Sequence, residues 1–221
     1  MVKSPIEYFE SQTFDAKATG TGGLSPAEQQ FMRKYLGVDG SASAAILESI
    51  PEAKGDPDSA PHDLDQDVSY EATLREEPQV QLVGFNMDSQ LFTIPTMLVQ
   101  EVIRTMEPSR LPMTPSYVSG IINLRGRVTP MIRLRDLLGS TPPPRGQADR
   151  FTIICRCQGL QLGVQIDSVR SMYRINQEDI QWNVEVELGI NGDCIAGLFK
   201  LNDKLVPIIS VERIVETMLQ E

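Results

Sequence analysis

The sequence predicts an all-β domain with short helices, preceded by a mostly disordered acidic extension. Short apolar segments separated by Gly and Pro support this, as do an internal repeat and a change in composition near residue 79. Residues 1–78 contain six Lys/Arg and fifteen Asp/Glu, whereas residues 79–221 contain fourteen and fifteen. We therefore expect an extension at 1–78 and a folded domain at 79–221.

The sequence of the extension predicts one short helix, at about residues 25–36. Ser25 can cap it, Pro26 suits the first helical position and Glu28 completes a capping box. Phe31 and Tyr35 form an apolar stripe. Because so short a helix is marginal alone in water, three states stay open: docking on its own domain, docking on a partner, or an unfolded segment. The following residues, up to Pro78, have the composition of a disordered linker.

The sequence pattern of the folded region predicts many short strands. Residues 79–87 alternate apolar and polar, Asp88 to Gln90 supply a turn, and residues 91–94 return as a second strand. Further strands are expected at 128–134, 151–157, 160–166 and 205–211, with short helices at 134–138 and 211–219. Short strands separated by Gly and Pro favour a barrel or sandwich.

An internal repeat divides this region into two similar units. Residues 94–102 align with 164–172 at an offset of 70, and residues 124–132 align with 201–209 at an offset of 77. A single unit of about 70 residues would bury little core. We therefore expect two small barrels that pack together and share a core.

The residues needed for catalysis are missing from the folded region. The single histidine, His62, lies in the extension, which removes the usual general base and metal ligand. No phosphate loop, nucleophile elbow or dinucleotide fingerprint follows an expected strand. The cysteines Cys155, Cys157 and Cys194 are expected to be reduced and packed on strands. We expect no enzyme activity, no catalytic residues, no cofactor and no metal site.

The sequence also limits location and partners. No run of about 18 apolar residues indicates a transmembrane helix, and the amino terminus lacks the apolar core of a secretory signal. The acidic extension argues against nucleic-acid binding. We expect a cytoplasmic protein that does not insert into the membrane.

Arginines gather around the segment 120–139. A polar rim of a protein interface would have this composition, and so would a solvated barrel face; charge alone leaves both open. The residues are Arg104, Arg110, Arg125, Arg127, Arg133 and Arg135.

The sequence from residue 79 to 221 resembles the CheW-like domain of bacterial chemotaxis. The residues that carry the resemblance are Val99-Gln100-Glu101-Val102, Gly120-Ile121-Ile122-Asn123-Leu124-Arg125-Gly126, Pro130 and Leu134-Arg135, with weaker support from Ile195-Ala196-Gly197-Leu198 and Leu205 to Ile209. The resemblance implies two SH3-like five-stranded β-barrels. It also implies an adaptor that couples the cytoplasmic tip of a chemoreceptor to a CheA-type histidine kinase.

The resemblance further implies candidate site residues. A receptor-binding surface would include Val99, Glu101, Arg125 and Gly126. A kinase-binding surface would lie on the second unit, for which we name Ile195, Gly197 and Leu198. The alternative is a CheW-like scaffold for a chemosensory pathway outside chemotaxis, such as surface motility or second-messenger control.

Overall fold

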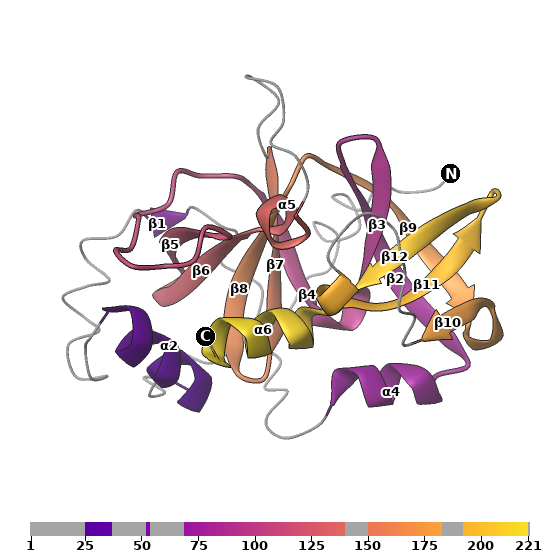
Figure 1. Cartoon of the computed structure of the whole chain (residues 1–221), viewed down its shortest axis with the longest axis horizontal. Helices are drawn as coiled ribbons and strands as arrows, with labels where there is room; N and C mark the ends of the chain where they lie inside the picture. Colours follow the sequence, from indigo (N-terminus) through magenta and orange to yellow (C-terminus); the bar gives the residue numbers. More distant parts are fainter. Residues whose placement is uncertain (1–24, 37–51, 54–68, 140–149, 183–191, 221) are drawn as a thin grey trace.

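The structure, a computed structural model, describes residues 25–36, 52–53, 69–139, 150–182 and 192–220. The strands in these ranges form two six-stranded sheets that lie side by side, with short helices around them (Figure 1). Each sheet contains one strand of only two or three residues beside five longer ones. The expected all-β fold with two small barrels is therefore confirmed.

The first barrel takes its longer strands from the middle of the chain. Their order is β1-β5-β6-β8-β7-β4. An isolated bridge between Ser109 and Ile121 joins the chain after β4 to β5, which helps to close the sheet into a barrel. The strands are β1 (Glu52–Ala53), β4 (Val99–Arg104), β5 (Val118–Leu124), β6 (Arg127–Arg133), β7 (Phe151–Cys157) and β8 (Leu160–Ile166).

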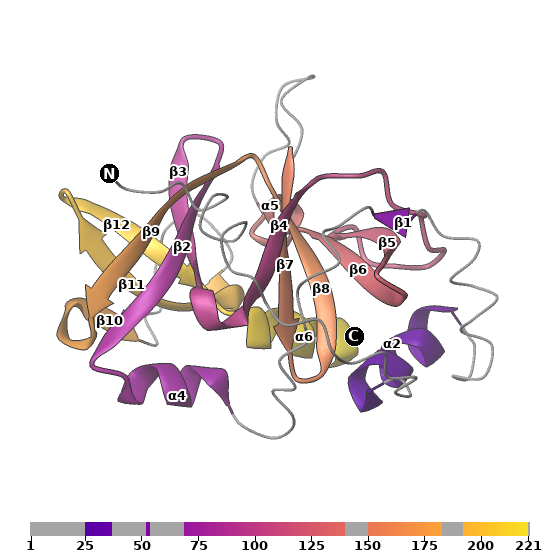
Figure 2. The ribbon, with the colours of Figure 1, turned by 180° about the vertical axis from the view of Figure 1, so that it is seen from behind.

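The second barrel combines strands from both ends of the folded region, in the order β10-β11-β12-β3-β2-β9. Figure 2 shows the long strands β2 and β9 of this barrel beside β4 and β7 of the first. The strands are β2 (Gln79–Met87), β3 (Gln90–Pro95), β9 (Ser168–Asn176), β10 (Ile180–Trp182), β11 (Ile195–Leu201) and β12 (Lys204–Ile209).

The two sequence repeats exchange hairpins between the barrels. Hairpin β2–β3 of the first unit pairs with strands of the second unit, and hairpin β7–β8 of the second unit pairs with strands of the first. Met131 of β6 pairs in parallel with Gly163 of β8, and Ile208 of β12 pairs in parallel with Thr93 of β3. The sequence offsets of 77 and 70 convert one pair into the other, so the barrels are related by a pseudo-symmetry that the repeat encodes.

One apolar core crosses from barrel to barrel. The largest cluster of buried side chains includes Phe85 and Ile94 of the second barrel and Ile132 and Val164 of the first. Helix α6 (Val211–Gln220) contributes to the same cluster through side chains such as Met218, which is fully buried. The shorter α5 (Leu134–Leu137) follows β6 as α6 follows β12, again at an offset of 77. The barrels therefore share a core, as expected.

Among the described residues before β2, two segments are helical. Helix α2 (Pro26–Leu36) packs against α6, and α4 (Tyr70–Glu76) packs below the second barrel (Figure 1). The sequence predicted the first of these helices but not the second, because residues 70–76 were assigned to a disordered linker. Most of the expected disorder in residues 1–78 lies outside the described residues, and the boundary at residue 79 stays a prediction.

Candidate protein-interaction site

Two candidate interaction residues, Glu101 and Arg125, form an ion pair on the first barrel. Arg125 Nη2 donates to Glu101 Oε2 over 3.1 Å, and the side chains are 26% and 17% exposed. Glu101 lies on β4 and Arg125 between β5 and β6, so barrel closure brings the two together. A partly exposed pair adds at most about 1 kcal/mol to stability. Its main effect is to hold two opposite charges in a fixed arrangement at the surface.

The turn between β5 and β6 determines where Arg125 lies. Arg125 and Gly126 have φ angles of 55° and 76°, the positive values that a two-residue hairpin of type I′ requires. Asn123 Oδ1 accepts a hydrogen bond from the Gly126 N–H at 2.9 Å. The side chain of Leu124 is buried and anchors the end of β5. The sequence Asn-Leu-Arg-Gly therefore supplies an acceptor, an anchor and a residue suited to positive φ.

The other two candidate receptor residues lie beside this ion pair. Gly126 occupies the same turn as Arg125, and Val99 lies two positions before Glu101 on β4. Val99 is only 9% exposed and belongs to the shared core. The pairing of β4 with β7 shifts register between Val99 and Glu101, which marks a bulge at this point. The structure therefore places all four candidate residues in one region, with the charges outside and Val99 largely inside.

The three candidate kinase residues lie on β11 of the second barrel, and all are buried. Ile195 and Leu198 are each 2% exposed, and the Ile195 carbonyl accepts a hydrogen bond from Arg213 Nη1 at 2.9 Å. A Cβ added to Gly197 would approach the Gln181 carbonyl oxygen to 2.8 Å, so this glycine permits close packing with β10. Their assignment to a kinase interface stays a prediction, because buried side chains do not themselves form a surface.

A buried arginine links the barrels, and sequence reasoning missed this role. Arg135 of α5 is 3% exposed and makes ion pairs with Asp88, in the β2–β3 turn, and with Asp167, between β8 and β9, the latter at 2.9 Å. Burial works to lower the pKa of Arg135, but the hydrogen bonds and charges of the two aspartates more than offset it and raise that pKa. Leu134-Arg135 belongs to the motif that carries the family resemblance, which was the available signal.

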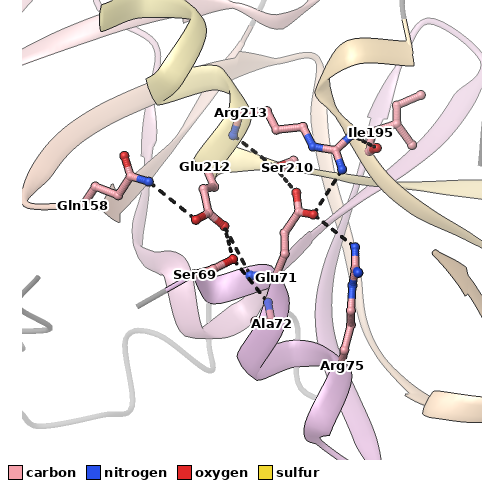
Figure 3. A network of polar contacts seen from close by, with 9 residues as sticks. All are labelled: Ser69, Glu71, Ala72, Arg75, Gln158, Ile195, Ser210, Glu212 and Arg213. Carbon is pink, nitrogen blue, oxygen red and sulfur yellow. Dashed lines mark hydrogen bonds and ion pairs between the residues drawn. The ribbon is translucent and has the colours of Figure 1, made fainter. Parts of the chain in front are cut away.

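A second polar network joins α4 to α6 at the second barrel (Figure 3). Glu71 accepts hydrogen bonds from Ser210 and from Arg213, the latter at 3.2 Å, and it also pairs with Arg75. Glu212 accepts from the Ser69 hydroxyl at 3.2 Å and from the Glu71 N–H at 3.3 Å. Figure 3 shows Glu71 and Glu212 side by side, each directed toward donors on the opposite helix. Helix α4 is therefore fixed to the folded domain.

The signal for α4 was present in the sequence. Ser69 caps the helix by accepting from the Ala72 N–H, while Glu71 and Arg75 complement the charges of its first and last turns. Leu74 is buried in the core of the second barrel. A helix of seven residues gives only a weak signal in a sequence. The acidic and polar residues around it are typical of a linker, and for that reason the helix was not predicted.

The described residues offer little for catalysis. Burial raises the pKa of the Cys157 and Cys194 thiols to about 12, and it raises the pKa of Cys155 even further. All three cysteines are free and buried. Cys155 and Cys157 lie on β7, as expected, whereas Cys194 ends a short 3₁₀ helix, Gly192–Cys194, and does not lie on a strand. Within the described ranges, no cluster of three or more His, Cys, Asp or Glu side chains could hold a metal ion. Nor is any helix in those ranges long and apolar enough to cross a membrane.

Known proteins share this fold and sequence pattern. The family model described as the CheW-like domain matches residues 81–218. A chemotaxis protein CheW from Helicobacter pylori is 34% identical over 140 residues, which cover 63% of this chain and 84% of the relative. A chemotaxis protein CheW from Treponema pallidum is 26% identical over 62% of this chain and 83% of its own length.

A solved structure gives the same result. The crystal structure of the scaffolding protein TtCheW from Thermoanaerobacter tengcongensis matches with a TM-score of 0.55 and 28% sequence identity. The match covers 60% of this chain and 89% of that one.

Proposed function

The chain belongs to the CheW-like family, and we propose that it couples chemoreceptors to a CheA-type histidine kinase. The family match over residues 81–218 confirms the resemblance inferred from the sequence. At the level of the family, the chain is a chemotaxis scaffold or adaptor and not an enzyme. The two partners, and the surfaces that bind them, are our proposal.

The Glu101–Arg125 ion pair carries the receptor part of this proposal. It brings together a charge from β4 and a charge from the β5–β6 turn at a partly exposed position, next to Gly126 and two residues from the buried Val99. A receptor tip shaped as a helical hairpin would present side chains on a ridge, and fixed charges would select its register and orientation. We propose that Glu101 and Arg125 make the polar contacts, while Val99 and Gly126 set the shape of the surface.

We assign the kinase to the second barrel. Ile195, Gly197 and Leu198 are buried, so we propose that they support an interface instead of contacting the kinase through their side chains. Such an interface would use exposed groups on the same barrel, for example Leu205, which is 50% exposed on β12. We further propose that the chain acts in the cytoplasm, at receptor arrays that it reaches through these partners. A related pathway outside chemotaxis, such as surface motility or second-messenger control, is the alternative, and the genes beside its own gene would distinguish the two pathways.

Titration calorimetry against a receptor cytoplasmic fragment from the same genome tests the receptor site. We expect Arg125→Ala and Glu101→Ala each to weaken binding by about 10-fold, the loss expected for a charged hydrogen bond. Lys200→Ala is the matched control, because Lys200 forms an exposed ion pair with Asp203 at the equivalent hairpin of the second barrel. Wild-type affinity in both site variants would contradict the assignment.

A further inference from the structure

The amino-terminal helix α2 bridges three parts of the folded domain. At its start, the Ser25 hydroxyl donates to the Gly159 carbonyl in the β7–β8 turn, at 2.7 Å. At its end, Lys34 Nζ and the Tyr35 hydroxyl both donate to the Met218 carbonyl of α6, each at 2.9 Å. A third contact reaches Arg127 of β6. The helix is therefore held at both ends by different elements.

Burial of apolar side chains holds α2 firmly in place. Phe31 and Met32 are each 1% exposed and belong to the core shared by the barrels. Full burial of such side chains contributes about 1.5–3 kcal/mol each. That contribution overcomes the marginal stability of an isolated helix of this length. Of the three states left open by the sequence, the structure shows docking on the chain's own domain.

The third contact is an ion pair between Glu28 of α2 and Arg127 of β6. Arg127 Nη1 donates to Glu28 Oε1 over 3.0 Å, while the Ser25 N–H donates to Glu28 Oε2 over 2.8 Å. The Glu28 side chain is 3% exposed, whereas Arg127 is 36% exposed. A buried carboxylate needs its charged partner more than an exposed one does. Glu28 therefore connects Arg127, at the start of β6, to the helix.

This ion pair acts on the hairpin that carries the candidate receptor site. Arg127 pairs with Leu124 across the turn, and between them lie Arg125 and Gly126. The extension also touches the other strand of this hairpin, because β1 pairs in parallel with β5 at Asn123 and Leu124. Both strands of the hairpin are thus held by residues that precede the CheW-like domain.

We propose that α2 is a brace for the β5–β6 hairpin, and that Glu28 is a positioning residue that acts through Arg127 on Arg125. Loss of the brace leaves the turn held by strand pairing, by the Asn123–Gly126 hydrogen bond and by the Glu101–Arg125 pair. The turn then samples more positions, and the receptor surface is less well organised before binding. This inference rests on the proposed receptor site. The effect of α2 on the mobility of the hairpin, however, can be measured without any partner.

Two measurements on the full chain test the brace. The first is amide hydrogen exchange at residues 123–128 in the wild type, Glu28→Gln and Arg127→Gln. We expect both variants to speed exchange there by about 10-fold, the value of one charge-assisted hydrogen bond. The control is Lys204→Gln, which changes the exposed position equivalent to Arg127 in hairpin β11–β12; it should leave residues 123–128 unchanged. Unchanged exchange in Glu28→Gln overturns the brace.

The second measurement is binding to the receptor fragment and, separately, to a kinase regulatory-domain fragment from the same genome. We expect Glu28→Gln to weaken receptor binding by about three-fold through lost preorganisation and to leave kinase binding unchanged. Arg127→Lys, which keeps the charge, should restore most of the receptor affinity lost in Arg127→Gln. Equal receptor affinity in wild type and Glu28→Gln overturns the positioning role. Failure of the wild type to bind the receptor fragment overturns the proposed function, while the exchange result still decides the brace.

Discussion

Arg135 and Asp88 form an ion pair across the two barrels, although Arg135 belongs to α5 of the first and Asp88 to the β2–β3 turn of the second. Asp167 completes the group, and its carboxylate also accepts from the Asp88 N–H at 2.6 Å. The equivalent position on α6, at an offset of 77, is Glu212, whose carboxylate faces Gln158 in the β7–β8 turn. The pseudo-symmetry thus places polar contacts at two equivalent positions. The contact at Arg135 is a cluster of ion pairs, whereas the contact between Glu212 and Gln158 is a single hydrogen bond.

The Arg135 link should contribute substantially to stability. Arg135→Met removes a buried cation and leaves two aspartates that water can reach, since Asp88 is 47% exposed. We expect the free energy of unfolding to fall by about 2 kcal/mol, less than the cost of breaking a fully buried pair. Urea unfolding followed by circular dichroism measures this change. Arg133→Met, at a more exposed ion pair at the end of β6, is the control, and an equal effect in both variants would refute the link.

The glycines of the family motif should differ in their cost of substitution. Gly120 has a φ of 143°, and an added Cβ would lie 2.2 Å from the Ser109 carbonyl oxygen. Gly126 has a φ of 76°, but an added Cβ would meet no atom within 4 Å. We expect Gly126→Ala to cost about 1 kcal/mol through backbone strain alone and Gly120→Ala to cost at least about 1 kcal/mol more through the clash. Thermal unfolding in parallel gives the order, and a reversed order would contradict the reason given for Gly120.

The buried thiols should make the protein sensitive to alkaline pH. An unfolded cysteine ionises near pH 8.5, whereas folding raises the pKa of Cys157 and Cys194 to about 12. Between these values the unfolded chain loses protons that the folded chain keeps, so stability falls as pH rises. The expected slope is about 1.4 kcal/mol per pH unit for each thiol. Urea unfolding from pH 8 to pH 11 measures it.

The control for this pH dependence is a variant in which all three cysteines are alanine. Tyr and Lys side chains also titrate in this range, and they remain in the variant. The slope due to thiols is therefore the difference between the two proteins. Identical slopes would show that the thiols ionise alike in the folded and unfolded states, contrary to their burial.

Much of the fold could be predicted because its signals are local. Alternating polarity predicted β2 at residues 79–87, where the structure has it. Ser25, Pro26 and Glu28 predicted the start of α2, and Ser25 and Glu28 form the expected reciprocal hydrogen bonds. The offsets of 70 and 77 predicted two related barrels because the five longer strands and the last helix of one unit each have a counterpart in the other. The same repeat predicted a helix at residues 211–219, and the structure has α6 at Val211–Gln220.

The remaining features depend on pairing between distant segments. A repeat shows which segments correspond, but not that hairpins β2–β3 and β7–β8 change places between the barrels. The sequence named Glu101 and Arg125 through a family resemblance, yet only barrel closure shows that they touch. The family resemblance suggested Ile195 and Leu198 for a kinase surface, but both residues are buried. They lie on β11, which is flanked by β10 and β12, and a strand that is buried on both faces lacks the alternation of a strand with one exposed face. The contacts of α2 with the Met218 carbonyl likewise could not be predicted, because they depend on the position of α6 in the folded domain.

The central claim is that one molecule of this chain binds a chemoreceptor and a CheA-type kinase at the same time. Sedimentation of the purified chain with a receptor cytoplasmic fragment and a kinase regulatory-domain fragment, alone and together, tests it directly. We predict a complex of all three proteins in which kinase and receptor sediment together only when this chain is present, and which Arg125→Ala depletes of receptor but not of kinase. Two separate binary complexes, or no binding to either fragment at low salt, would contradict the coupling function.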